Sequence, residues 1–166
     1  QLTVKVQPLA KPSEDELHQA MLNGIRDKGL SVLNWTAEAE QLRLRLLCAA
    51  KWLPEYDWPA VDNESLLATL ETWLLPHMAG VHSLRGPNSL DIYQALRGLL
   101  DWGMQQRLDS ELPAHYTVPT GSRIAIRYHE DNPPALAVRM QEMFGEATNP
   151  TIAQGRVPLV LELLSP

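Results

Sequence analysis

Residues 112–128 read Leu112-Pro-Ala-His-Tyr-Thr-Val-Pro-Thr-Gly-Ser-Arg-Ile-Ala-Ile-Arg-Tyr128 and decide the fold class, because the apolar pattern changes its period here. Residues 115–118 are β-prone, residues 119–122 favour a turn, and residues 123–128 alternate strictly between apolar and other side chains. The stretch therefore predicts two short strands joined by a turn.

Upstream of this stretch, residues 12–112 follow the helical period and predict a bundle of short helices separated by Pro and Gly. Ser13 followed by Glu16 is a capping-box pattern that begins the first helix, and Pro54 prevents the second from continuing. The expected helices cover residues near 13–28, 37–52, 64–75, 89–99 and 102–112.

Downstream, Pro133-Pro134 is expected to open one more helix, which Gly145 ends. Strands are expected near residues 151–153 and 157–164. Residues 113–166 thus predict a small β-rich α+β unit, cut short at its C-terminus. The chain as a whole is expected to be α+β, a short-helix bundle followed by a small mixed α/β unit.

Both ends of the chain suggest a piece of a longer protein. Residues 2–6 alternate in strand fashion, and a strand needs a partner. Residues 157–166 stop straight after an apolar run, whereas a natural terminus more often ends in polar residues.

Composition limits the function classes. The 166 residues carry 45% apolar residues and a net charge of -6, which suits a soluble globular chain and argues against a whole-surface nucleic-acid binder. No apolar run approaches the roughly 20 residues of a membrane span, so no membrane partner is expected. The single cysteine, Cys48, excludes an internal disulfide framework and fits a reducing compartment, the cytoplasm.

The motifs that would carry chemistry are absent. The sequence has no phosphate loop and no G-x-S-x-G, H-E-x-x-H or C-x-x-C pattern. Asp15-Glu-Leu-His18 superficially resembles a D-E-x-H motif, but a capped helix start explains these residues. His115 and His129 have no carboxylate in the same segment to orient them, so they are weak candidates for acid–base catalysis. We expect no catalytic, cofactor-binding or metal site.

The five tryptophans all lie in the helical part, where large rings usually fill a core. Exposed rings would instead stack on bases. Trp58, in a loop, is the least certain to pack.

Three arginines are the candidates for contact with nucleic acid: Arg123, Arg127 and Arg156. Arg123 and Arg127 lie an even number of residues apart on one strand, so they share a face. Two guanidinium groups so placed suit successive phosphates. The alternative is a solvated strand face whose arginines pair with Glu130, Asp131 or Glu162.

Several segments resemble a known family. Residues 112–124, residues 133–145 and Gly155-Arg-Val-Pro-Leu-Val-Leu-Glu-Leu-Leu-Ser-Pro166 are similar to the C-terminal region of the HrpB family of bacterial DEAH-box ATP-dependent RNA helicases. Residues 16–30 and 66–73 resemble that region too, so the likeness spans nearly the whole chain.

The resemblance implies a parent helicase whose ATPase core, with ATP and Mg²⁺, lies N-terminal to Gln1. Residues 1–8 would be the end strand of a preceding OB-like domain. None of the family's catalytic motifs maps onto this chain, so the fragment alone is not expected to be an enzyme. It would be an accessory module that packs on the rest of the helicase chain and guides single-stranded RNA. The alternative is a scaffolding module that binds a protein partner in an apolar groove between bundle and sheet.

Overall fold

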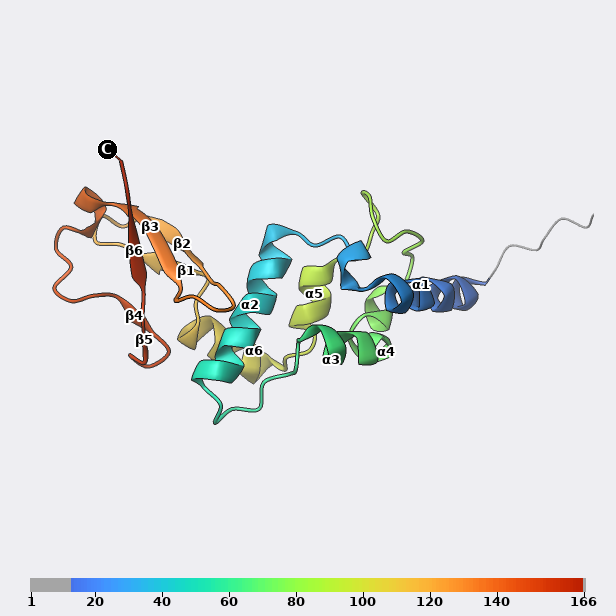
Figure 1. The fold of residues 1–166 in the computed structure, drawn as a ribbon. Coiled ribbons are helices and arrows are strands. Elements are labelled where there is room, and N and C mark those ends of the chain that lie inside the picture. The colour runs from blue at the N-terminus through green and yellow to red at the C-terminus, as the bar shows by residue number, and fades with distance from the viewer. Residues whose placement is uncertain (1–12, 166) are drawn as a thin grey trace, which may run out of the picture.

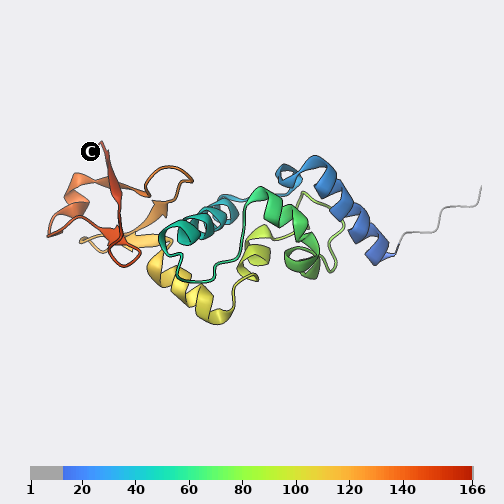
Figure 2. The same ribbon diagram turned by 60° about the horizontal axis from the view of Figure 1, so that its bottom comes forward.

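A computed structural model describes residues 13–165 of the chain, so the predicted strand over residues 1–8 lies outside the described residues. Helices come first along the chain and strands follow, which confirms the predicted α+β class (Figure 1). In both views the sheet lies at one end of an elongated molecule and α1 at the other (Figure 2). The helical elements are α1 (Glu14–Lys28), η1 (Leu30–Val32), α2 (Ala37–Trp52), α3 (Asn63–Ala68), α4 (Leu70–Trp73), η2 (Leu75–His77), α5 (Ile92–Arg97), α6 (Trp102–Glu111) and η3 (Met140–Met143).

Within residues 13–165, every α-helix except α4 begins where a polar cap can satisfy one of its first N–H groups. In each case the capping side chain accepts a hydrogen bond from the backbone N–H three residues later, which satisfies a donor that the helix leaves free. These caps confirm the predicted starts of the first, second and fifth helices. The capping residues are Ser13, Thr36, Asp62, Asp91 and Asp101.

Two predicted helices are shorter than expected. The helix predicted over residues 64–75 is divided into α3, α4 and η2, because Thr69 leaves the helical conformation and its hydroxyl donates to the Ser65 carbonyl at 2.8 Å. The helix predicted over residues 89–99 begins only after its cap, Asp91.

Within residues 13–165, six strands form two sheets. They are β1 (His115–Thr117), β2 (Arg123–Arg127), β3 (Ala135–Arg139), β4 (Thr151–Ile152), β5 (Val157–Pro158) and β6 (Val160–Leu164). The larger sheet has the order β1-β2-β3-β6, antiparallel except for the parallel β3–β6 pair, and β4 pairs with β5 in a small sheet of its own. The strand predicted over residues 157–164 is therefore two strands, divided at Leu159.

The helix predicted over residues 133–145 is wrong. Ala135–Arg139 form β3, and only residues 140–143 make a helical turn, η3. The segment lies between β2 and β6, which bind both of its edges, and it buries Leu136 and Val138. Strand pairing from both sides outweighs the helix propensity of Ala, Leu and Met.

Helix α2 joins the bundle to the sheet. The Gln41 side chain donates to the Tyr128 carbonyl at 3.3 Å and accepts from the Tyr128 N–H at 2.8 Å. Further along α2, the Cys48 thiol donates to the His129 carbonyl, and Lys51 donates to the Glu130 carbonyl. Burial raises the pKa of Cys48 to about 11, so the thiol remains protonated at neutral pH. The boundary near residue 112 stays a prediction, because one cluster of buried apolar residues runs through both parts.

A buried cation holds α6 against α2. Arg45 is 4% exposed, and its guanidinium donates to the Leu112 carbonyl at 2.8 Å and to Asp109 at 2.9 Å. Asp109 also accepts from Arg97 at 2.9 Å. Partial burial alone would raise the pKa of Asp109, but the hydrogen bonds from Arg97 and Arg45 outweigh it and lower the pKa below its ordinary 3.8. Asp109 is therefore the counter-ion of the buried Arg45.

We predict that Asp109→Asn lowers the free energy of unfolding at pH 7 by about 1–2 kcal/mol, because the buried Arg45 loses its counter-ion while the site stays partly solvated. A carboxylate with a lowered folded pKa stabilises the fold above its unfolded pKa and loses that effect as pH falls. The difference from the natural chain should therefore shrink below pH 3.8, measured by urea unfolding at several pH values. An equal difference at pH 7 and pH 2.5 would contradict this. Asp131→Asn, an exposed loop change, is the control.

Candidate nucleic-acid interface

The structure places Arg123 and Arg127 together on the outer face of β2. Both side chains are exposed, whereas Ile126 and Tyr128, which point the other way, are buried. At about 3.3 Å per residue the two arginines lie roughly 13 Å apart along the strand. The sequence therefore predicted their shared face correctly.

Arg139 joins them, which the sequence analysis missed. Arg127 is paired opposite Ala135, and residues opposite each other in a sheet share a face. Arg139 lies four residues after Ala135 on β3, hence on the same face, and it is exposed. We call Arg123, Arg127 and Arg139 the arginine face. Arg139 was missed because its segment was expected to be helical, and the run Ala135-Leu-Ala-Val138 offers no alternating signal.

Glu162 of β6 and Glu142 of η3 lie close to these arginines, and Glu142 accepts from the Arg139 backbone N–H at 2.9 Å. Arg127 lies 3.9 Å from Glu162 of β6, with both side chains exposed, so this pair is weak. Arg123 lies 3.5 Å from the His115 ring nitrogen. Within residues 13–165, no ion pair engages Arg123 or Arg139. Glu38 of α2 and His115 both line a small cavity of about 370 Å³ between bundle and sheet.

Arg156 does not join the arginine face. It lies in the turn between β4 and β5, and its guanidinium binds both oxygens of Glu55, at 2.9 and 2.6 Å, and the Trp52 carbonyl at 3.0 Å. The hydrogen bonds from Arg156 lower the pKa of Glu55 to about 2. These contacts tie the β4–β5 turn to the end of α2. They also occupy most of the N–H donors of the Arg156 guanidinium, so few remain for a phosphate.

The structure also locates the histidines and acidic residues that the sequence singled out. Asp15-Glu-Leu-His18 forms the start of α1, and His18 is buried with its ring nitrogen 3.0 Å from the Val81 carbonyl. His115 is exposed beside Arg123, and His129 is half-buried. In the part of the chain that the structure describes, no three His, Cys, Asp or Glu side chains gather as metal ligands.

Packing accounts for four of the five tryptophans, as expected. Trp73 is fully buried, and Trp58 is half-buried with its indole N–H donating to the Leu53 carbonyl at 2.9 Å. The prediction is wrong for Trp102, which is 76% exposed. Trp102 follows the cap Asp101 as the first residue of α6, so it lies off the apolar stripe that buries Leu108.

The arginine face combines positive charge with the forked hydrogen-bond donors that suit phosphate groups, and the His115 ring lies beside Arg123. Among residues 13–165, no helix combines the length and apolarity needed to cross a bilayer.

Comparison with known proteins agrees with the resemblance read from the sequence. The family model for the ATP-dependent helicase C-terminal region, HrpB_C, matches residues 73–166. The chain is 97% identical, over all 166 residues, to the ATP-dependent RNA helicase HrpB of Escherichia coli strain K12, and it spans 20% of that protein's length. Two crystal structures from E. coli, of the DExH-box NTPase HrpB and of the DEAH/RHA helicase HrpB, match 99% of the chain at 97% identity, with TM-scores of 0.90 and 0.88. The chain covers 20% and 21% of those two crystallised chains. With the family model covering more than half of its residues, the chain belongs to the HrpB_C family of ATP-dependent helicase C-terminal regions.

Proposed function

We propose that the chain is a non-catalytic accessory module of a bacterial, cytoplasmic ATP-dependent RNA helicase, and that its arginine face contacts single-stranded RNA. The observation that carries the RNA contact is the grouping of Arg123, Arg127 and Arg139 on one exposed sheet face of an otherwise acidic chain. ATP and Mg²⁺ would be bound by other parts of the helicase.

Small side chains lie between these arginines. Ala125 and Ala137 share the arginine face, so an extended strand can approach the sheet closely between the charged groups. Within the described strands this face carries no Phe, Tyr or Trp and no side-chain amide for reading base edges, and its one aromatic ring is the imidazole of His115 beside Arg123. The face therefore suits phosphate contacts, which position a strand without reading its sequence.

The accessory role also needs a surface that packs on the rest of the helicase. β6 is an edge strand with Val160, Leu163 and Leu164 exposed by 45%, 56% and 50%. Met140 and Phe144, in and next to η3, are exposed by 58% and 69%. We call these five residues the apolar edge. Val160 and Leu164 border the arginine face, because they pair opposite Ala135 and Arg139, whereas Leu163 points to the other side of the sheet. Among the described residues no strand pairs with the outer edge of β6. Exposed apolar groups beside such an edge indicate an interface, and a relative about five times longer supplies chain to cover them.

We predict that Arg123→Ala, Arg127→Ala and Arg139→Ala each weaken the binding of single-stranded RNA to a similar extent for every RNA sequence. Each substitution removes about one phosphate contact, so the slope of log K against log salt should fall by about 0.7. Fluorescence anisotropy with a labelled oligouridine over a salt series measures both quantities.

Arg156→Ala is the matched control, because it removes the same charge from a guanidinium held by Glu55. Absence of RNA binding at low salt would refute the RNA contact. So would an Arg156→Ala loss as large as the other three, because the chain would then respond to net charge alone.

We predict that Leu163→Asp and Leu164→Asp in the full-length helicase expose residues 113–166 to limited proteolysis. A charge within a buried apolar interface is costly, whereas the same side chains are exposed in the isolated chain, whose melting temperature should change little. Trp102→Asp, which places the same charge on an exposed apolar residue away from the apolar edge, is the control. Unchanged proteolysis in both leucine variants would count against packing through this edge.

A further inference from the structure

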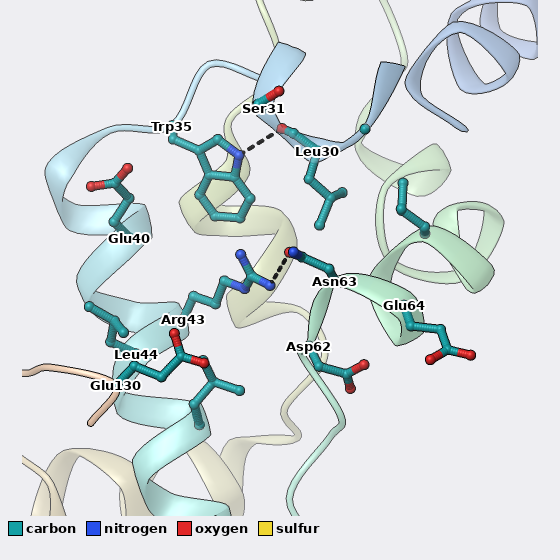
Figure 3. A pocket seen from close by; sticks show the side chains of 13 residues that line it. Leu30, Ser31, Trp35, Glu40, Arg43, Leu44, Asp62, Asn63, Glu64 and Glu130 are labelled. Atoms are coloured by element: carbon teal, nitrogen blue, oxygen red, sulfur yellow. Dashed lines mark hydrogen bonds between the residues drawn. The ribbon is translucent and has the colours of Figure 1, made fainter. Parts of the chain in front are cut away.

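The bundle carries an open groove of about 850 Å³ (Figure 3), and none of the three arginines of the arginine face lines it. α2 forms one wall, the segment from Gly29 to Ser31 and the start of α3 form the other, and Glu130 lies at one end. The apolar side chains that line it are Leu30, Trp35, Leu44, Leu47 and Leu67.

One wall of the groove is held in place before any partner binds. Arg43 donates to the Val61 carbonyl at 2.8 Å and to the Asn63 side chain at 2.6 Å, and its guanidinium lies 5.5 Å from the centre of the Trp35 ring. The Trp35 indole N–H donates to the Leu30 carbonyl at 2.9 Å. A cation over an aromatic face adds further attraction. Arg43 is thus committed to the protein and is not free to hold an anionic ligand.

The rim is negatively charged. Glu40, Glu64 and Glu130 are exposed, and within residues 13–165 no ion pair engages their carboxylates. Asp62 is a fourth carboxylate, engaged as the cap of α3. Burial lowers the pKa of Arg43, and the fields of Glu130 and Asp62 oppose that shift.

Cations are few at this groove. Arg43 is the one basic residue among the described residues that line it. Lys51 lies near one end, where its ammonium donates to the Glu130 backbone carbonyl at 2.7 Å. The rim therefore repels phosphates, which makes RNA an unfavourable occupant.

An apolar floor under an acidic rim matches a side chain that has an aliphatic stem and a cationic head. We propose that this groove binds a basic segment of a protein, with a lysine or arginine stem on the leucine floor and its head among Glu40, Glu64 and Glu130. This interaction goes beyond the proposed RNA contact and uses a different part of the chain.

The test measures binding of a labelled nine-residue peptide of alternating arginine and alanine to the chain by fluorescence anisotropy. A peptide with citrulline in place of arginine keeps the shape without the charge. We expect the citrulline peptide to bind at least about tenfold more weakly, and Glu40→Gln and Glu64→Gln each to weaken the arginine peptide about threefold. Asp57→Asn, an exposed carboxylate outside the groove, is the matched control and should leave affinity unchanged.

The apolar floor gives a second, independent variant. Leu67→Ser, at a half-buried floor position, should weaken the arginine peptide without changing net charge. Losses of equal size in Asp57→Asn and Glu64→Gln would overturn the proposal, because the peptide would then respond only to net charge. Direct binding of labelled oligouridine that Leu67→Ser weakens would overturn it as well, by assigning the groove to RNA. The arginine-face variants should bind the peptide normally, so this test and the RNA test fail separately.

Discussion

The Gln41 side chain forms hydrogen bonds with both the N–H and the C=O of Tyr128, the residue just after β2. Without it, a buried N–H and C=O would be left unpaired, at a cost of about 1–3 kcal/mol each. Because Gln41 lies in the second turn of α2, one side chain of the bundle holds the end of a strand. Together with the contacts of Cys48 and Lys51, it fixes how the sheet is oriented relative to the bundle, and with it the position of the arginine face.

The arginines divide by how they are held, and sequence counts cannot show that division. Arg45 and Arg43 belong to α2 yet serve the interior and the groove wall, while Arg156 closes a turn through Glu55. Arg123 and Arg139 lie on the sheet with no ion pair among the described residues. A net charge of -6 is therefore compatible with a basic face. Some arginines are bound by groups of the chain itself, whereas others are exposed to solvent.

Local signals predicted the local elements well. The capping residues Ser13, Thr36 and Asp101 predicted the starts of three helices, and the alternation over residues 123–128 predicted β2. The resemblance of residues 112–166 to the family predicted the family itself. What failed was non-local: β3 forms because β6, more than twenty residues later, pairs with it in parallel, and no window around residues 133–145 contains that information.

The same reason explains which parts of the candidate sites stayed hidden. Arg139 joins the arginine face only through the register of β3 on β2, and Arg45 is buried only because α6 ends above it. The groove needs α2, α3 and the turn at Glu130 together. Sequence periodicity assigns a residue to a face of its own element, but a site forms between elements.

The arginine face and the groove are held at fixed positions relative to each other because both depend on α2. Gln41 and Arg43 are two residues apart, so one helix fixes the sheet end and the groove wall. A ligand in the groove can alter RNA binding only if it binds more tightly to one arrangement of α2 against the sheet than to another. The contacts of Gln41, Cys48 and Lys51 with residues 128–130 oppose any second arrangement. The basic segment and the RNA strand would then bind independently, and the module would hold two partners at a fixed distance.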